Sequence, residues 1–218
     1  MSKILIVPDV HGRDFWIEPC QKWQGSIGFL GDYHDPYPFQ VSKEKSLEIL
    51  KQLVEFYENN KDRVTCLIGN HDGNYLIKSG FADRVDSYHY AEVESLLKKL
   101  DLKTAYLHND ILFSHAGALK EWLEINNLSI EEVPGLDFKN KALADVSPYR
   151  GGSAKVGGIL WGDVQEYDEH THVPGIYQVF GHTQLVKDPI IHKDYACLDC
   201  RQCFIIDTET KEIIPYNE

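Results

Sequence analysis

Five short apolar runs of the sequence each lead into a glycine that stands near Asp, Asn or His, and this pattern restricts the fold more than any other feature. The first run, residues 4–7, is typical of a strand buried on both faces, and the motif PDVHG follows it at residues 8–12. Ligands in α/β sheets bind outside the carboxyl ends of strands, and a carboxylate with an imidazole suits a divalent metal. Because Asp and Gly are also common turn residues, PDVHG alone predicts either a metal site or a turn.

The other four runs end in similar motifs: FLGDYHD at residues 29–35, LIGNHDG at 67–73, FSHAG at 113–117 and VFGHT at 179–183. Their polar side chains offer oxygen and nitrogen ligands, and their glycines let backbone segments approach closely. One such motif supports a metal site weakly, since short motifs match by chance. Five in succession are a much stronger indication.

The apolar runs alternate with helical patterns. Strands are predicted at residues 26–31 and 63–69, and the segment 42–60 between them is an amphipathic helix with Ser42 as its N-cap. The apolar face of this helix consists of Leu47, Leu50, Val54 and Tyr57. Strands separated by helices predict βαβ units and a largely parallel sheet.

The second half of the chain is predicted to be less regular. We expect a helix at residues 92–100 and a hairpin at 102–117, with Asn109 and Asp110 near its turn. ILWGD at 159–163 and IYQVFGH at 176–182 are predicted to be strands, and a terminal antiparallel pair is expected around residues 208–210. The region 121–158 is interpreted as a helical and looped insertion near a site.

Length and charge exclude some classes of protein. A chain of 218 residues fits a single domain, 1–218. The formal net charge of -12 argues against a general duplex-binding surface, which needs a basic face. The start of the sequence lacks the features of a signal peptide, and no apolar stretch approaches the length of a membrane span. We therefore expect a cytoplasmic protein that binds neither duplex nucleic acid nor a membrane.

The five cysteines form no obvious disulfide framework. Cys20 and Cys66 are predicted to be small buried apolar groups. Cys197, Cys200 and Cys203 lie in CLDCRQC, whose spacing resembles part of a zinc or iron–sulfur site, although no fourth Cys or His follows closely. Reduced structural thiols and a metal site both remain open for this segment.

The motifs follow one another as DxH, GDxxD, GNH, a His beside small residues, and GH. In this order they resemble the calcineurin-like metallophosphoesterases over nearly the whole chain. DVHG, SHAG, LWGD and VFGHT are most similar to the phosphoprotein phosphatase branch, which includes bacterial and phage-type serine/threonine phosphatases and dinucleoside tetraphosphatases. The resemblance implies an α/β fold, a four-layer αββα sandwich with a dimetal site at the carboxyl ends of the strands.

The resemblance also implies a set of ligands for two divalent metal ions, namely Asp9, His11, Asp32, Asn70, His115 and His182. The first two would bind one ion, the last three the other, and Asp32 would bridge both. Two ions that share a carboxylate suit an in-line displacement at phosphorus, and their charge makes the pocket of an acidic protein locally cationic. The ligands permit Mn, Fe, Zn, Co or Ni, of which we expect Mn.

His71 would be the general acid, because it follows a ligand and the same turn brings it to the site. Asp35 resembles the carboxylate that orients this imidazole and favours its protonated form. Asp35 also precedes Pro36, so a plain turn residue is an alternative reading. Asp72 is predicted to support the ligands or to cap a helix.

The resemblance is incomplete after Asp35. Protein phosphatases usually continue with Arg-Gly, where the arginine grips the phosphoryl group, whereas this chain continues with Pro-Tyr-Pro at residues 36–38. Possible replacements are Arg13, Arg150 and Arg201. We favour Arg150 as the substrate-binding residue because it lies in the glycine-bearing loop RGGSAKVGG.

Together these features predict a dimetal-dependent phosphoesterase that hydrolyses phosphomonoesters by attack of a water molecule acidified by the metal ions. Its substrate would be a phosphorylated protein or a small phosphoester. A dinucleoside polyphosphate hydrolase is the alternative activity. A non-catalytic interaction module on the same fold is the alternative outside enzymes.

Overall fold

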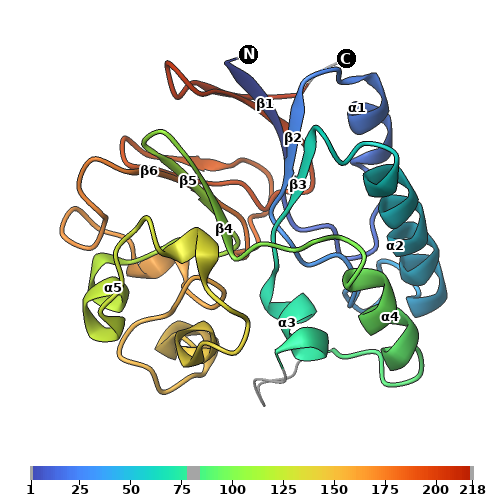
Figure 1. Cartoon of the computed structure of the whole chain (residues 1–218), viewed down its shortest axis with the longest axis horizontal. Helices are drawn as coiled ribbons and strands as arrows, with labels where there is room; N and C mark the ends of the chain where they lie inside the picture. The colour runs from blue at the N-terminus through green and yellow to red at the C-terminus, as the bar shows by residue number, and fades with distance from the viewer. Residues whose placement is uncertain (1, 78–83, 217–218) are drawn as a thin grey trace. The chain divides into compact units, whose positions relative to one another are not determined.

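Two five-stranded sheets form the framework of the structure, and each belongs to a separate unit of the chain. Unit 1 comprises residues 1–102 and 201–218, and unit 2 comprises residues 103–200. The computed structural model describes residues 2–77 and 84–216 (Figure 1). Two mixed sheets with helices match the α/β sandwich class predicted from the sequence. The assignment of the whole chain to one domain stays a prediction.

The sheet of unit 1 has the strand order β10-β9-β1-β2-β3. Its parallel part consists of β1 (Lys3–Val7), β2 (Ser26–Phe29) and β3 (Val64–Cys66). The antiparallel part consists of β9 (Phe204–Asp207) and β10 (Ile213–Pro215). The predicted parallel strands and the terminal antiparallel pair are confirmed, and the three parallel strands end at one edge of the sheet.

Helices α1 (Ile17–Lys22), α2 (Lys43–Glu58) and α4 (Tyr90–Leu97) lie on one side of β1, β2 and β3 (Figure 1). The predicted N-cap of α2 is confirmed, because the Ser42 side chain accepts a hydrogen bond from the backbone of Lys45 at 3.1 Å. The buried face of α2 contains Leu47, Ile49, Leu50, Leu53, Val54 and Tyr57. This apolar face packs into the core of unit 1, as its spacing predicted.

The sheet of unit 2 has the order β4-β5-β6-β8-β7. The predicted hairpin consists of β4 (Ala105–His108) and β5 (Ile111–Ser114), and Asn109 in its turn has a left-handed φ of 52°. The remaining strands are β6 (Tyr177–Phe180), β7 (Ile190–Ile191) and β8 (Tyr195–Cys197). Because β5 and β6 are parallel neighbours, the residues that follow them leave the same edge of this sheet.

The irregular region expected at residues 121–158 is helical and looped. It begins inside α5 (Lys120–Asn126). After α5 it includes three short 3-10 helices, at Val133–Gly135, Lys141–Ala144 and Pro148–Arg150. A fourth 3-10 helix lies beyond it at Val164–Glu166.

The strand predicted at ILWGD, residues 159–163, is wrong, because this segment is a turn. The backbone N–H groups of Trp161 and Gly162 both donate to the Gly158 carbonyl, at 2.9 and 2.7 Å. Ile159 and Leu160 are buried all the same. A run of three apolar residues reports burial and does not separate a strand from a buried turn.

All five cysteines are buried thiols. Cys203 lies in the core of unit 1 with Cys20 and Cys66, and burial raises the pKa of Cys203 to about 12. Within residues 2–77 and 84–216, the side-chain groups spaced to hold a metal ion contain no cysteine.

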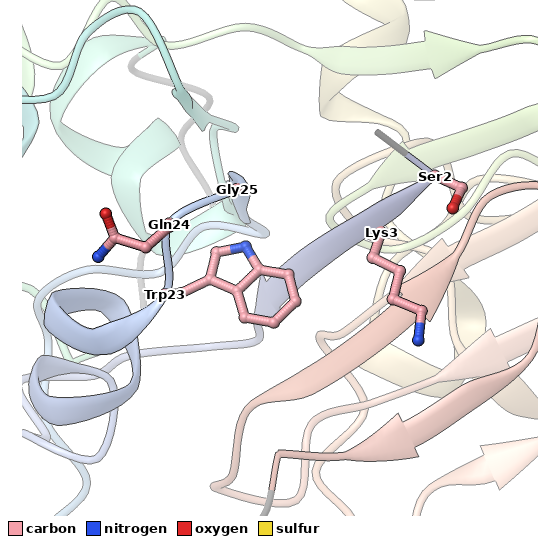
Figure 2. A pocket seen from close by; sticks show the side chains of 5 residues that line it. All are labelled: Ser2, Lys3, Trp23, Gln24 and Gly25. Atoms are coloured by element: carbon pink, nitrogen blue, oxygen red, sulfur yellow. The ribbon is translucent and has the colours of Figure 1, made fainter.

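A cavity of about 480 Å³ in unit 1 is lined by Ser2, Lys3, Trp23, Gln24 and Gly25. Figure 2 shows the Trp23 indole pointing from the end of α1 toward the start of β1. The cavity therefore lies at the amino-terminal edge of the parallel strands, opposite to the edge where ligands of α/β sheets bind.

Of the helices in the described part of the chain, none has the length and apolar character to cross a membrane.

Candidate metal and catalytic site

Backbone hydrogen bonds continue beyond the carboxyl ends of β1, β2 and β3 and hold the following loops together. The N–H of His11 donates to the carbonyl of Asp32 at 2.7 Å, and the N–H of Leu67 donates to the carbonyl of Phe29 at 2.9 Å. The three predicted motifs of unit 1 therefore lie next to one another.

Gly31 and Gly69 are required where the loops after β2 and β3 meet. Gly31 has a φ of 110°, and a Cβ on it would lie 2.5 Å from the backbone nitrogen of Gly69. A Cβ on Gly69 would collide with the carboxylate of Asp32. The two glycines thus let the Asp32 side chain lie against the start of α3 (Asn70–Leu76).

Asp72 has both of the roles that the sequence left open. Its carboxylate accepts the N–H of Gly69 at 2.8 Å, which caps α3. It also accepts the backbone N–H groups of Asp32, at 2.8 Å, and Tyr33, at 3.1 Å. One buried carboxylate therefore fixes the loop that carries Asp32 relative to the helix that carries Asn70 and His71.

His11, Asp9 and Asp32 are buried, with exposed fractions of 2%, 1% and 1%. Ligand atoms of His11 and Asp32 lie within 4.8 Å of each other and of a His71 nitrogen, a spacing that could hold a metal ion. The Nδ1 atom of His11 donates to the backbone carbonyls of His34 and Asp35, both at 3.1 Å. Its Nε2 atom therefore faces the carboxylates, 3.4 Å from Asp32 Oδ2 and 4.0 Å from Asp9 Oδ2. A hydrogen bond from one ring nitrogen to a carbonyl is the usual arrangement for a histidine that binds a metal through the other.

The chemistry of these donors fits a divalent cation. Burial, followed by the charge of His71, holds the pKa of His11 well below its usual value, which favours a neutral imidazole. Burial raises the pKa of Asp32 well above its usual value, and the charge of Asp9 raises it further. The lone pair of His11 Nε2 and the carboxylates of Asp9 and Asp32 repel one another where they are buried together. A bound cation would attract all three groups and so offset this repulsion.

His71 and Asp35 lie beside this cluster. The Nδ1 atom of His71 is 3.3 Å from Asp35 Oδ2, and the rings of His71 and His11 are 5.1 Å apart at their centroids. The backbone N–H of His71 donates to Asp32 Oδ1 at 2.9 Å. Asp35 therefore orients the His71 ring through Nδ1, and Nε2 lies on the side of the ring away from Asp35. A general acid needs one oriented nitrogen and a second one that transfers the proton.

Asp35 is itself held by residues that the sequence reasoning missed. Its Oδ1 atom accepts the hydroxyl of Tyr75 at 2.5 Å and the backbone N–H of Asp86 at 3.3 Å. Burial raises the pKa of Tyr75, so its hydroxyl remains a donor. Since Asp35 is fully buried among these partners, its role extends beyond a turn before proline.

A second polar network lies behind Asp35. Asp86 binds His34 Nε2 at 3.3 Å and His89 Nδ1 at 2.8 Å, and Ser46 Oγ lies 2.7 Å from His34 Nδ1. Burial alone would raise the pKa of Asp86, but its bonds with the two histidines lower it to about 2. Ser46, His34 and Asp86 resemble a catalytic triad in order, yet each is at most 1% exposed, so this network supports the site and has no access to a substrate.

Strained backbone is concentrated at the predicted site residues. Left-handed φ angles occur at four of them that are not glycine: His11 at 45°, Asp32 at 55°, Asp35 at 54° and His182 at 63°. Each such conformation costs roughly 1–3 kcal/mol and persists only where the surroundings enforce it.

In unit 2 the structure brings His115 and His182 together. They follow the parallel strands β5 and β6, and the N–H of Gly181 donates to the carbonyl of His115 at 2.9 Å. His115 Nε2 and His182 Nδ1 are 3.0 Å apart, and the two residues are 0% and 7% exposed. Two buried imidazole nitrogens that face each other are suited to share a cation.

Arg150 lies close to this histidine pair. Its Nε atom is 2.7 Å from Asp163 Oδ2, and its Nη2 atom donates to the carbonyl of His182 at 3.3 Å and to the hydroxyl of Thr183 at 2.8 Å. Its assignment as a substrate-binding residue stays a prediction.

The predicted ligand Asn70 is the first residue of α3 and is 4% exposed.

The sequence matches the model of a protein family described as calcineurin-like phosphoesterase over residues 2–188. The chain belongs to the calcineurin-like phosphoesterase family. The matched range contains all five strand-end motifs, so the family predicted from them is confirmed. A search of curated proteins found no significant match.

Solved structures of phosphatases share the fold of this family member. A cold-active protein-tyrosine phosphatase from a psychrophilic Shewanella species aligns with a TM-score of 0.64 and 15% identity, over 100% of this chain and 81% of that chain. A protein serine/threonine phosphatase from Saccharomyces cerevisiae, with similarity to human phosphatase PP5, aligns with a TM-score of 0.59 and 15% identity, over 100% of this chain and 80% of that chain. These alignments support the predicted fold.

The contact between Gly69 and Asp32 predicts a specific cost of adding one methyl group. Gly69→Ala should lower the free energy of unfolding by about 1–3 kcal/mol, because the new Cβ displaces a buried carboxylate. Gly135→Ala is the matched control, since a Cβ on Gly135 would meet no atom within 4 Å. Urea denaturation of both variants measures the difference. Equal stability of the two would contradict the packing described for the Asp32 loop.

Proposed function

We propose that this member of the calcineurin-like phosphoesterase family is a metal-dependent phosphomonoesterase. The observation that carries the proposal is the pairing of His71 with Asp35, 3.3 Å apart, directly beside the buried cluster of His11 and Asp32. A metal-binding cluster alone would also suit a structural ion. An oriented imidazole beside it is what proton transfer to a leaving group needs.

The proposed metal ligands are those expected from the sequence. These ligands would be Asp9, His11, Asp32, Asn70, His115 and His182, and they would hold two divalent ions, of which Mn²⁺ is the proposed identity. When bound, the pair of cations would acidify the attacking water and neutralise charge on the phosphoryl group.

Residues of the chain would then assist the departure of the leaving group. The oxygen of a water molecule forms a bond to phosphorus, the ester P–O bond breaks, and His71 passes a proton from Nε2 to the departing oxygen, so that inorganic phosphate and an alcohol are released. Asp35 would hold His71 through Nδ1 and stabilise its protonated form. Tyr75 would keep Asp35 in place through its short hydrogen bond.

The proposed substrate class is a phosphorylated protein or a small phosphomonoester, with Arg150 as one contact to its phosphoryl group. A dinucleoside polyphosphate is the other candidate, and a comparison of phosphopeptides with diadenosine tetraphosphate at equal concentrations decides between them. Ten-fold or greater preference in kcat/KM for either class assigns the substrate.

Hydrolysis of 4-nitrophenyl phosphate tests the dependence on metal. We expect turnover with Mn²⁺, loss of turnover with EDTA, and a decrease in kcat of about a hundredfold or more in Asp32→Asn, because the amide removes the charge of a proposed metal ligand. Glu58→Gln, an exposed acid at the end of α2, serves as the control and should behave as wild type. Activity without metal, or equal activity in Asp32→Asn, would reject the mechanism. No activity with any metal or phosphoester would favour an interaction module.

The role of His71 predicts a dependence on the leaving group. His71→Gln should slow hydrolysis of phenyl phosphate by about 10²–10⁴-fold, and it should slow 4-nitrophenyl phosphate much less, because a good leaving group departs without a proton. His170→Gln changes an exposed histidine and should leave both rates unchanged. Equal losses with both esters in His71→Gln would remove His71 from the role of general acid.

A further inference from the structure

Two of the three arginines considered from the sequence, Arg13 and Arg201, lie in unit 1 with His71. In unit 1, Arg13 donates through Nη2 to the carbonyl of Asp9 at 2.7 Å and through Nε to the carbonyl of Val10 at 2.9 Å. It therefore stabilises the backbone of the loop that carries Asp9. Arg201 is exposed.

A different arginine, Arg84, lies directly against His71. Its Nη2 atom is 2.7 Å from His71 Nε2, the nitrogen on the side of the ring opposite to Asp35. This is the nitrogen from which a proton would pass to the departing oxygen. A guanidinium one hydrogen bond away from Nε2 is within reach of the phosphoryl group that carries that oxygen.

The guanidinium of Arg84 packs against an aromatic ring. Its central carbon lies 3.7 Å from the centroid of the Tyr37 ring, a cation–π distance, and the Tyr37 ring also meets His11 edge-on at 4.8 Å between centroids. Tyr37 stands between Pro36 and Pro38, which limit the conformations of its backbone. The Tyr37 ring thus places the charge of Arg84 beside both His71 and His11.

The backbone at Arg84 supports a positioned side chain. Its φ is 54°, a left-handed angle that is uncommon in a residue other than glycine.

We propose that Arg84 is a substrate-binding residue that grips the phosphoryl oxygens through its planar fork of N–H groups. The proposal rests on the proposed phosphoesterase function and adds a contact that no sequence motif indicated. On binding, the Arg84 N–H groups exchange His71 Nε2 for two phosphoryl oxygens, which leaves Nε2 facing the ester oxygen. Arginine suits this exchange because its fork of N–H groups matches two oxygens of one phosphate, and the Tyr37 ring packs against the guanidinium.

The test compares Arg84→Gln and Arg84→Lys with Arg201→Gln, an exposed arginine of the same unit. The measurements are kcat and KM for 4-nitrophenyl phosphate with Mn²⁺, and the inhibition constant of inorganic phosphate. Arg84→Gln should weaken phosphate inhibition and raise KM by about 10- to 100-fold, since a charged hydrogen-bond donor is lost. Arg84→Lys should recover part of the loss, and Arg201→Gln should match wild type.

The leaving group separates a phosphate grip from a role in orienting His71. If Arg84 binds the phosphoryl group, Arg84→Gln reduces kcat/KM by a similar factor for phenyl phosphate and 4-nitrophenyl phosphate. A much larger loss with phenyl phosphate would mean that Arg84 acts only through His71, and it would overturn the proposal.

Folding of the variants is checked by thermal unfolding, and Tyr37→Leu provides a second route if Arg84→Gln does not fold. This variant keeps Arg84 and removes the ring beneath it, so phosphate inhibition should weaken by a smaller factor. Unchanged phosphate inhibition in folded Arg84→Gln would overturn the proposal. If Arg84→Gln does not fold, unchanged phosphate inhibition in Tyr37→Leu would overturn it. In either case metal-dependent activity of the wild type would leave the proposed function intact. A wild-type protein without metal-dependent phosphoesterase activity would overturn both.

Discussion

The rest of the site depends on one constraint: two carboxylates and an imidazole nitrogen are buried close together. Asp9, His11 and Asp32 are each at least 98% inaccessible to solvent, and the imidazole is turned so that Nε2 faces both carboxylates. Such an arrangement costs free energy unless positive charge compensates it. A chain that only needed a stable core would gain by replacing these groups with apolar ones.

The surrounding structure follows from bringing those groups together. Three parallel strands end at one edge, Gly31 and Gly69 allow their loops to touch, and Asp72 joins the Asp32 loop to α3. Hydrogen bonds from several elements hold the left-handed backbone at His11, Asp32 and Asp35. The strain is therefore distributed around the site, and stability elsewhere in the sheet and in α2 offsets it.

Much of the framework could be predicted because it depends on short sequence patterns. The parallel strands, the N-cap of α2, the hairpin after residue 102 and the terminal strand pair all follow from local periodicity and turn residues. The closeness of His71 and Asp35 followed from the resemblance of two motifs to a known family. The turn at residues 159–163 was mistaken for a strand because burial alone does not determine backbone conformation.

The supports of the site could not be predicted in the same way. Tyr75, Arg84 and Asp86 reach Asp35 and His71 through contacts between residues that are far apart in the sequence. Arg84 stands in no motif, and an isolated arginine in a sequence is ordinarily a solvated surface residue. Its signal is three-dimensional: a guanidinium packed between a tyrosine ring and an imidazole nitrogen.

The central claim, that the strand ends hold a pair of metal ions, is tested most directly by anomalous diffraction from crystals grown with Mn²⁺. The account predicts two manganese peaks. One should lie within ligand distance of Asp9 and His11, and the other within ligand distance of His115 and His182. Manganese that binds elsewhere, or no manganese within ligand distance of these side chains, would contradict it.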